Sequence, residues 1–220
     1  MGQKINPISY RLPALGIEAY QSRWFTTNHK RYVAYLMSDQ KLRKALMKKL
    51  ASAGVTRIEI ERSLRNIKVI IFVTRPGIVI GRGGSGLEEL KKFITKNLDI
   101  KLNDKSAPKI DMQVEEVKQP DLNAYLVATR IAEQLVKRMP GRRVATKTIE
   151  RTMSSGAKGI KILLSGRVNG AEIARREAYH QGSVPLQTIR SDVDFAHVPA
   201  LTRSGYVGVK VWICRGEKTN

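Results

Sequence analysis

Closely spaced glycines in the segment GIVIGRGGSGLEELKKF, residues 77–93, permit two kinds of phosphate chemistry. Gly81, Gly83 and Gly86 match G-x-G-x-x-G, the turn that holds the pyrophosphate of a dinucleotide at the start of a helix. Gly81 and Gly84 also match G-x-x-G, a loop that grips the backbone of single-stranded nucleic acid. Glycine suits both because it has no Cβ to keep a phosphate away from the backbone. The elements around the glycines must decide between the two interpretations.

A second group of residues suited to phosphate lies in VKRMPGRRVATKTIERTM, residues 136–153. Arg143, Lys147 and Arg151 recur every four residues, so a helix would align them on one face. A run of charge is most often a solvated helix face. Here only Glu150 offers a compensating charge, which favours a stripe that follows phosphates. The predicted site consists of Arg138, Arg142, Arg143, Lys147 and Arg151.

The charge of the whole chain also indicates a polyanionic partner. Lys and Arg number 40 against 19 Asp and Glu, which gives a net charge of +21. Such an excess repels itself in a compact fold unless a partner neutralises it. The partner could be nucleic acid, an anionic membrane or an acidic protein. Because only 6% of the residues are aromatic, we expect neutralisation of a phosphate backbone to outweigh base stacking.

Membrane binding is the weaker alternative. No apolar run approaches the roughly 20 residues that a membrane span needs. The first residues, MGQKINPISYRL, contain no apolar signal core. We therefore expect a cytoplasmic protein without a membrane partner.

Catalytic chemistry is not indicated by any motif. Cys214 is the only cysteine and the three histidines are far apart in the sequence, so we expect neither a disulfide nor a metal site. No G-x-S-x-G motif occurs. Glu115 and Glu116 are neighbours on a predicted strand and would point to opposite faces. We predict no catalytic residues, no metal and no cofactor, unless folding brings distant groups together.

The first half of the chain contains the elements that must position the glycines. Residues 1–31 are polar, basic and interrupted by prolines, and we interpret them as an arm that orders on a partner. A helix is predicted over 38–54, with Ser38 as its cap and Gly54 as its end. Apolar periodicity then predicts strands and one amphipathic helix, over 55–62, 66–74, 85–98 (the helix) and 108–117.

The order of these elements favours nucleic acid over a dinucleotide. A dinucleotide turn needs a strand leading directly into the glycines, then a helix, then a parallel strand with an acidic residue about 20 residues on. Asp99 lies near that distance, but no clear buried strand precedes it. Leu87 stands where a P-loop needs lysine. A KH loop instead joins two helices, and the short piece GIVI supplies the first, which predicts an RNA-binding loop of Gly81, Arg82, Gly83 and Gly84.

The second half of the chain reads as a separate α+β domain. Pro120 marks the boundary, and helices are predicted over 121–138, with an Asp cap, and about 142–156. Strand signals follow at 160–164, 189–195 and 207–213, with a short helix predicted near AEIARREAYH, residues 171–180. Consecutive strands after paired helices favour antiparallel pairing.

Five segments are specific enough to indicate a family: MGQKINP, RPGIVIGRGG, GAKGIKILLSGRVNGAEIAR, VPLQTIRSDVDFA and GYVGVKVWICRGE. Together they span nearly the whole chain and resemble the bacterial-type family of small-subunit ribosomal protein three. The resemblance implies a basic N-terminal arm over 1–31, a type II KH domain over 32–118 and a C-terminal α+β domain with an antiparallel sheet over 119–220.

The resemblance also implies a function. Family members are structural constituents of the head of the small ribosomal subunit, where they bind ribosomal RNA near the proteins numbered ten and fourteen. They line the channel through which messenger RNA enters, and they assist its positioning and unwinding. The basic positions that contact the messenger match Arg142 and Arg143 here. The ribosome would be cytoplasmic, or in an organellar matrix if the chain is encoded by an organelle.

Three features depart from the family pattern, two at single residues and one in the length of a connection. The third basic position of the messenger-binding helix falls on Thr146, with Lys147 next to it. Gly83 stands in the KH loop where the family often has a basic residue. The connection over 97–113 is longer than expected, which predicts an extended surface loop.

Two other functions stay open from the sequence. Some eukaryotic relatives of the family are associated with nuclease or lyase activity on damaged nucleic acid, and lysine is abundant here. A KH protein can also regulate messages outside the ribosome. Neither alternative is supported by a specific spacing of residues in this chain.

Overall fold

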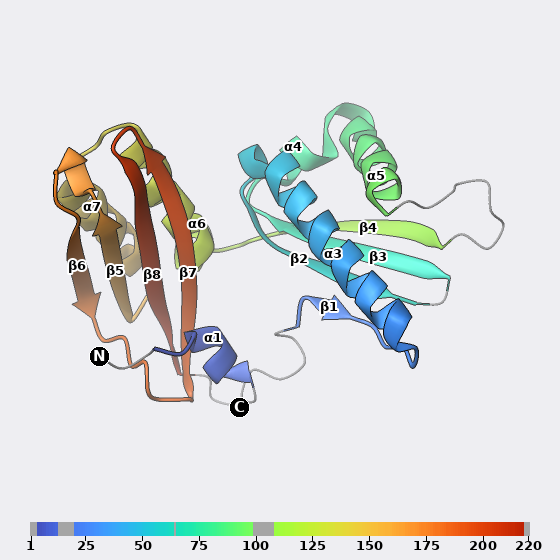
Figure 1. The fold of residues 1–220 in the computed structure, drawn as a ribbon, viewed down its shortest axis with the longest axis horizontal. Coiled ribbons are helices and arrows are strands. Elements are labelled where there is room, and N and C mark those ends of the chain that lie inside the picture. The colour runs from blue at the N-terminus through green and yellow to red at the C-terminus, as the bar shows by residue number, and fades with distance from the viewer. Residues whose placement is uncertain (1–3, 13–19, 64, 99–107, 218–220) are drawn as a thin grey trace. The chain divides into compact units, whose positions relative to one another are not determined.

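The computed structural model describes residues 4–12, 20–63, 65–98 and 108–217 (Figure 1). Their contacts divide the chain into two units. One unit is Ile17–Lys118, and the other combines Met1–Gly16 with Gln119–Asn220. We call the second the C-terminal unit.

The unit Ile17–Lys118 has the element order of a type II KH domain, and we call it the KH unit. Helix α3 (His29–Lys49) precedes strands β2 (Val55–Arg62) and β3 (Asn66–Val73). Helices α4 (Pro76–Ile80) and α5 (Ser85–Asn97) and strand β4 (Lys109–Glu116) follow. Strands β2 and β3 are antiparallel, β4 runs parallel to β3, and the short strand β1 (Ser22–Arg23) runs parallel to β2. The predicted α+β fold with a type II KH domain is confirmed.

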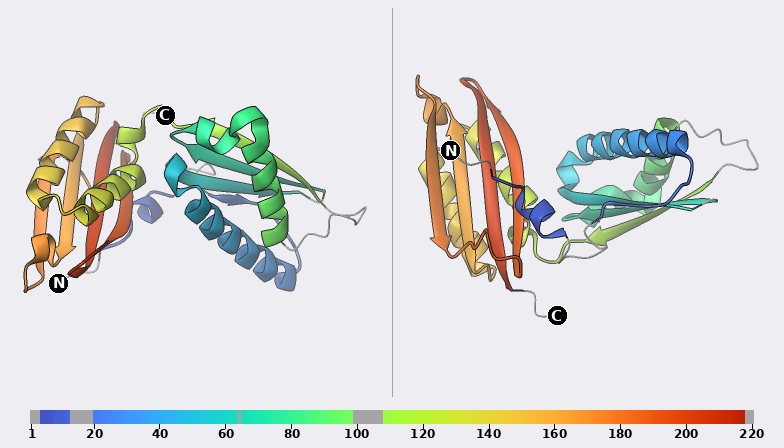
Figure 2. Two further views of the ribbon diagram at one scale, coloured as in Figure 1. Left: turned by 90° about the horizontal axis from the view of Figure 1, so that it is seen from above. Right: turned by 60° about the horizontal axis from the view of Figure 1, so that its bottom comes forward.

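Helices α3 and α5 lie on the same face of the KH sheet (Figure 2). Their buried residues recur four positions apart, as a single helix face requires. Buried strand residues recur every second position, because alternate side chains of a strand point to one face. The resulting core contains Leu42 and Leu46 of α3, Leu90 and Ile94 of α5, and Ile58, Ile60, Val69 and Ile71 of the sheet.

Helix α3 begins at His29 and not at the predicted Ser38. Its cap is Asn28, whose side-chain oxygen accepts a hydrogen bond from the Lys30 N–H at 3.0 Å. The Ser38 hydroxyl instead donates to the carbonyl of Tyr35. The first turns were missed because side chains such as Tyr32 and Leu36 are exposed, so they do not continue the apolar face. A short 3₁₀ turn (Ala51–Ala53) separates α3 from Gly54, whose φ is +69°.

A buried carboxylate ties residues upstream of α3 to the KH unit. Asp39 is 1% exposed and accepts hydrogen bonds from Trp24 Nε1 at 2.8 Å and Arg62 Nε at 2.8 Å. It also forms an ion pair with Arg62. One carboxylate therefore connects α3 to β2 and to the segment that follows β1.

The described residues of the C-terminal unit after Lys118 form helices α6 (Ala124–Val136) and α7 (Gly141–Ser154) and an antiparallel sheet. These helices precede the four strands. The sheet order is β6-β5-β8-β7, and every pairing is antiparallel, as predicted. The strands are β5 (Gly159–Gly166), β6 (Arg175–Gly182), β7 (Ser191–Thr202) and β8 (Gly205–Glu217).

The short helix predicted near AEIARREAYH is wrong, because this segment contains most of strand β6. Arg175–Gly182 pairs with β5 over its whole length, with Ala178 opposite Leu163 and Tyr179 opposite Ile162. Strand β6 is an edge strand, and Tyr179 is its residue that packs on the core. Its sequence therefore lacks the apolar alternation that identifies a central strand.

Helices α6 and α7 bury their apolar faces against one face of this sheet. Val127, Ile131 and Val144 of the helices meet the strand residues Ile160, Ile162, Leu164, Val209, Val211 and Ile213. The cap of α6 is Asn123, which accepts from the Tyr125 N–H at 3.1 Å, and not the predicted Asp121. Asp121 instead forms an ion pair with Arg130.

Asp194 of β7 holds the start of α6. Its carboxylate accepts the Ala124 N–H at 2.9 Å and pairs with Arg215 at 3.0 Å. Burial raises the pKa of Asp194, while Arg215 and the N–H groups of Ala124 and Phe195 oppose that rise. The N-terminus of a helix favours a negative charge, so this position is suitable for the carboxylate.

The first described residues pack on the C-terminal unit. Helix α1 (Pro7–Tyr10) contacts β7, and Arg11 after it is 1% exposed. The Arg11 guanidinium donates to the carbonyls of Pro7, Pro185, Leu186, Thr188 and Ser191, at 2.8 to 3.1 Å. A planar group with five N–H donors can satisfy this ring of carbonyls, whereas an ammonium cannot.

The structure shows where the described residues of the predicted arm, residues 1–31, lie. These residues pack within the chain, with residues 7–11 on the C-terminal unit and residues 22–24 on the KH unit. The domain boundaries at residues 31 and 118 stay predictions. Residues 99–107 of the long connection, including Asp99, lie outside the described residues.

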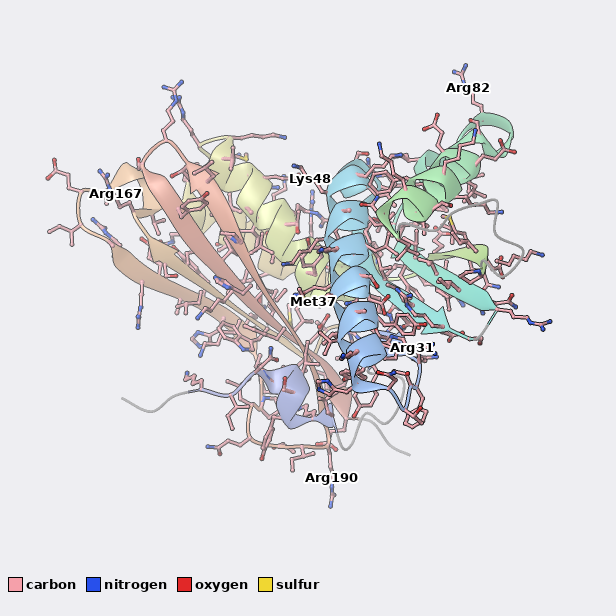
Figure 3. All side chains as sticks on the ribbon, turned by 45° about the vertical axis from the view of Figure 1, so that its right-hand side comes forward. Arg31, Met37, Lys48, Arg82, Arg167 and Arg190 are labelled. Carbon is pink, nitrogen blue, oxygen red and sulfur yellow. The ribbon has the colours of Figure 1, made fainter. Side chains whose placement is uncertain are left out.

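We expect the substitution Arg11→Met to lower the free energy of unfolding of the C-terminal unit by about 3 kcal/mol, because several buried carbonyls would lose their donor. Urea unfolding followed by Trp212 fluorescence would measure this. Arg190→Ala is the matched control, since Arg190 is exposed and points away from the unit (Figure 3). A change below about 0.5 kcal/mol for Arg11→Met would contradict the assigned role.

Candidate nucleic-acid interface

The predicted glycine loop connects two helices. Helix α4 ends at Ile80, the turn Arg82–Gly84 follows, and α5 begins at Ser85. Gly81, Gly83 and Gly84 have φ values of +71°, +60° and +83°, a region that residues with a Cβ adopt at a cost. The backbone conformation by itself is thus a sufficient reason for glycine at these three positions.

The glycine loop is open to a partner. Gly81, Arg82 and Gly83 are exposed, and Gly84 is half-buried. A Cβ added to Gly83 or Gly84 would meet nothing within 4 Å, so other atoms can approach the backbone there. Arg82 extends away from the KH unit (Figure 3). The free N–H groups at the start of α5 add a partial positive charge beside it.

Gly86 completes the G-x-G-x-x-G spacing of a dinucleotide turn, but its role in the structure is packing. A Cβ at this position would lie 2.5 Å from the Val79 carbonyl oxygen and 3.0 Å from that of Ile80. Gly86 is therefore required for close packing of α5 on α4. Helix α4 also stands between β3 and the glycines, whereas a dinucleotide turn needs the strand to lead directly into them. The structure agrees with the rejection of the dinucleotide.

Helix α7 presents the predicted basic residues on its exposed face. Arg142, Arg143, Lys147 and Arg151 are all exposed, and we call them the basic stripe. The opposite face buries Val144, Ala145, Thr148, Ile149 and Thr152 in the core. Part of the stripe lines an open depression of about 580 Å³, together with Pro140, Thr146 and Glu150.

The basic stripe forms no ion pair within the part of the chain that the structure describes. Glu150 is on the same exposed side. The Thr146 hydroxyl donates to the Arg142 carbonyl at 3.0 Å and so does not extend the stripe. The stripe can therefore neutralise an anion that another molecule supplies.

The start of α7 is fixed by contacts that the sequence analysis missed. The Gly141 N–H donates to Asn169 Oδ1 at 3.0 Å. A Cβ at Gly141 would lie 3.1 Å from Val168 and 3.2 Å from Leu164, so α7 starts close against β5 and the turn after it. Asn169 itself has φ of +57°. The Asn169-Gly170 dipeptide was the available signal, because it marks a tight turn.

Arg138 lies between the two helices and outside the basic stripe. It is exposed, and its φ of +60° is one of two positive values among the described residues other than glycine. Its N–H donates to the Leu135 carbonyl at 2.9 Å, which ends α6. Arg138 was predicted as a site residue. It lies before the N-terminus of α7 in the turn that follows α6, so it is not aligned with the basic stripe by helical spacing.

The edge strand β6 borders the basic stripe. The Tyr179 hydroxyl donates to Glu177 at 2.8 Å. Burial raises the pKa of Tyr179, the Glu177 carboxylate raises it further, and nearby Arg142 opposes both. The sequence analysis missed this strand, so it could not place Glu177 beside the stripe.

Other kinds of site find no support in the described part of the chain. No group of three or more His, Cys, Asp or Glu residues there is arranged to hold a metal ion. Cys214 is buried. None of the helices described is both long and apolar enough to cross a bilayer.

Comparison with known proteins gives a consistent result for both units. The KH domain profile matches residues 41–122, and the profile described as ribosomal protein S3, C-terminal domain, matches residues 131–213. The chain is 45% identical over 217 residues to small ribosomal subunit protein uS3 of Clostridium acetobutylicum, covering 99% of this chain and 93% of that protein.

Similar proteins occur in distant bacteria. The uS3 protein of Caldicellulosiruptor saccharolyticus is 46% identical, with 99% of this chain and 93% of that protein covered. The uS3 protein of Legionella pneumophila is also 46% identical, with 99% and 94% covered. Because these matches extend over nearly the whole chain, it belongs to the uS3 family of small ribosomal subunit proteins, which are structural components of the ribosome and not enzymes.

Proposed function

We propose that this chain binds ribosomal RNA in the head of the small subunit and contacts messenger RNA, with the basic stripe of α7, where the messenger enters the ribosome. The observation that carries the proposal is the distribution of charge on α7. Its four exposed cations have no ion-pair partner among the described residues, while its other face is anchored in the core. A rigid helix of this kind suits a long polyanion that moves past it.

The mechanism is electrostatic and involves no change in covalent bonds. Residues four apart on a helix are about 6 Å apart along its axis, so Arg143, Lys147 and Arg151 can contact successive phosphates of an extended strand. Phosphate contacts carry no sequence information, which suits a channel that accepts every message. A single strand held by its phosphates at the entrance biases the ribosome's own movement towards the opened duplex.

We expect Arg142→Ala combined with Arg143→Ala to slow translation through stable messenger hairpins and to leave unstructured messages unaffected. The physical reason is that two phosphate contacts are lost near the opened duplex. Single-ribosome dwell times on matched templates with and without a hairpin would measure the effect. Lys44→Ala with Lys48→Ala on α3 removes the same charge from the KH unit and serves as the control. Equal slowing on both templates would contradict the proposal.

We further propose that Lys147 supplies the basic side chain that is absent at position 146, where this chain has threonine. Lys147 is exposed on the stripe, one position beyond Thr146. Lys147→Ala should therefore lengthen the dwell at a hairpin, and adding Thr146→Lys should shorten it again. The same single-ribosome assay would compare the two variants. If Lys147→Ala has no effect, the third basic contact lies elsewhere.

The glycine loop of the KH unit is proposed to contact the backbone of ribosomal RNA. The loop Gly81–Gly84 offers accessible backbone, the Arg82 side chain and the start of α5. Gly83 keeps the loop free of a second side chain, so a phosphate can come close to the backbone.

Gly83→Asp should weaken binding to ribosomal RNA more than Gly83→Asn does. Both residues tolerate the φ of +60°, and nothing lies within 4 Å of the added Cβ, so the variants differ mainly in charge. Filter binding of full-length protein to small-subunit ribosomal RNA would compare them. Equal affinities would show that no phosphate lies near the loop.

Three finer statements rest on the sequence and on the family resemblance. These are the position next to the proteins numbered ten and fourteen, the location in the cytoplasm, and the division into residues 1–31, 32–118 and 119–220. We retain them as parts of the proposal. A lyase or nuclease activity on damaged nucleic acid is not favoured by any observation made on the described residues.

A further inference from the structure

The sheet of the C-terminal unit has a second face that α6 and α7 leave uncovered (Figure 2). Core residues such as Ile162 and Val209 point toward the helices, so the residues next to them in the chain point the other way. Strand register then places Leu163 opposite Lys210, and Lys210 opposite His197. We define the outer face by positions 161, 163 and 165 of β5, 176, 178 and 180 of β6, 193–201 (odd) of β7 and 206–214 (even) of β8.

The outer face contains basic side chains and no acidic ones. Along these described strand positions there is no Asp or Glu. Lys161 lies opposite His180, and Lys210 lies opposite His197. The set consists of Lys161, Arg176, His180, His197 and Lys210.

An exposed tyrosine and an exposed leucine lie opposite each other at one end of the outer face. Tyr206 is 69% exposed and is opposite Leu201, which is 60% exposed. They flank the β7–β8 turn. A tyrosine ring in this position offers a flat surface on which a base can stack.

The opposite end of the outer face is already occupied. Val193, Trp212 and Cys214 form a small buried cluster, against which Val184 and Leu186 pack. The contacts of Arg11 hold the loop that contains Leu186, and α1 lies on the side of the sheet opposite to α6 and α7 (Figure 2). The open part of the outer face therefore runs from Lys161 to the β7–β8 turn.

The middle of the open part contains Gly208, flanked by the side chains of Ser165 and His197. Gly208 has no side chain there, and a Cβ would lie 3.0 Å from Ser165 Oγ and 3.4 Å from His197 Nε2. Ser165 and His197 therefore cover the backbone of Gly208, and a partner on this face would meet these polar side chains first. A solvated face would be expected to mix charges of both signs.

From this arrangement, and resting on the proposed binding of ribosomal RNA, we propose that the outer face is an RNA-binding surface, separate from the basic stripe, that holds the backbone of ribosomal RNA and stacks one base on Tyr206. The basic stripe lies on α7, across the sheet, so a messenger strand held there cannot also lie on the outer face. The partner that fits is the RNA which keeps the protein in the subunit. Phosphates would lie near Lys161, Lys210 and Arg176.

The test is the salt dependence of binding by the full-length chain with Arg176→Gln and Lys210→Met, which keep the apolar stems of both side chains. The probe is protein-free small-subunit ribosomal RNA, titrated at several salt concentrations. Loss of two phosphate contacts should reduce the slope of log affinity against log salt by about 1.5 and weaken binding severalfold.

The control pair is Lys44→Met with Lys48→Met, which removes two exposed charges from α3. An equal change in both pairs would show general charge attraction and overturn the proposal, as would an unchanged slope in the outer-face pair. Arg142→Gln with Arg143→Gln separates messenger binding by the basic stripe from ribosomal RNA binding by the outer face. This pair should lengthen hairpin dwell times and leave the slope of log affinity against log salt unchanged. Circular dichroism and urea unfolding establish that every variant is folded.

Tyr206 provides an independent readout. Tyr206→Phe keeps the ring and should bind ribosomal RNA as the unchanged protein does, whereas Tyr206→Ala should bind about tenfold more weakly. Tyr206 is largely exposed, so neither change should disturb the core. Equal affinity of the two variants would remove the stacked base from the proposal.

Discussion

A net charge of +21 is the constraint to which the rest of this structure has to adapt. Two small cores must hold against the repulsion of so many cations. Two carboxylates stabilise the fold directly, since buried Asp39 binds Arg62 and half-buried Asp194 binds Arg215 at the start of α6. Carboxylates are correspondingly scarce on the surfaces proposed to meet RNA. The stripe on α7 lacks an ion-pair partner among the described residues, and the outer face of the C-terminal sheet has no acidic residue.

Rigid anchoring of the cations follows from close backbone packing. Gly141 lets α7 start against β5, and the buried face of α7 fixes which side chains face outward. Gly86 has the same purpose in the KH unit, where it lets α5 pack on α4. The loop glycines act differently, because Gly83 and Gly84 face open space and provide backbone conformation and access. Glycines that look alike in one motif thus have two separate physical roles.

The misplaced elements share a cause. Residues 29–37 of α3 and strand β6 expose most of their side chains, so neither shows the apolar period that marks a buried element. Asn123 caps α6 although Asp121 is an equally good capping residue. Asp121 lies in the 3₁₀ turn before the helix and pairs with Arg130 instead. The central strands and the glycine loop were predicted well, since their patterns depend on neighbours in sequence.

The sequence by itself determined the features that depend on residues close together in the chain. The glycine loop between two helices, the basic stripe on α7 and the apolar strands all depend on residues within a few positions of one another. Only the tertiary structure decided which distant residues meet. Arg11 finds carbonyls more than 170 positions away, and the outer face emerges only when four strands are in register. Such contacts follow from how buried polar groups are satisfied across the fold, which no local pattern records.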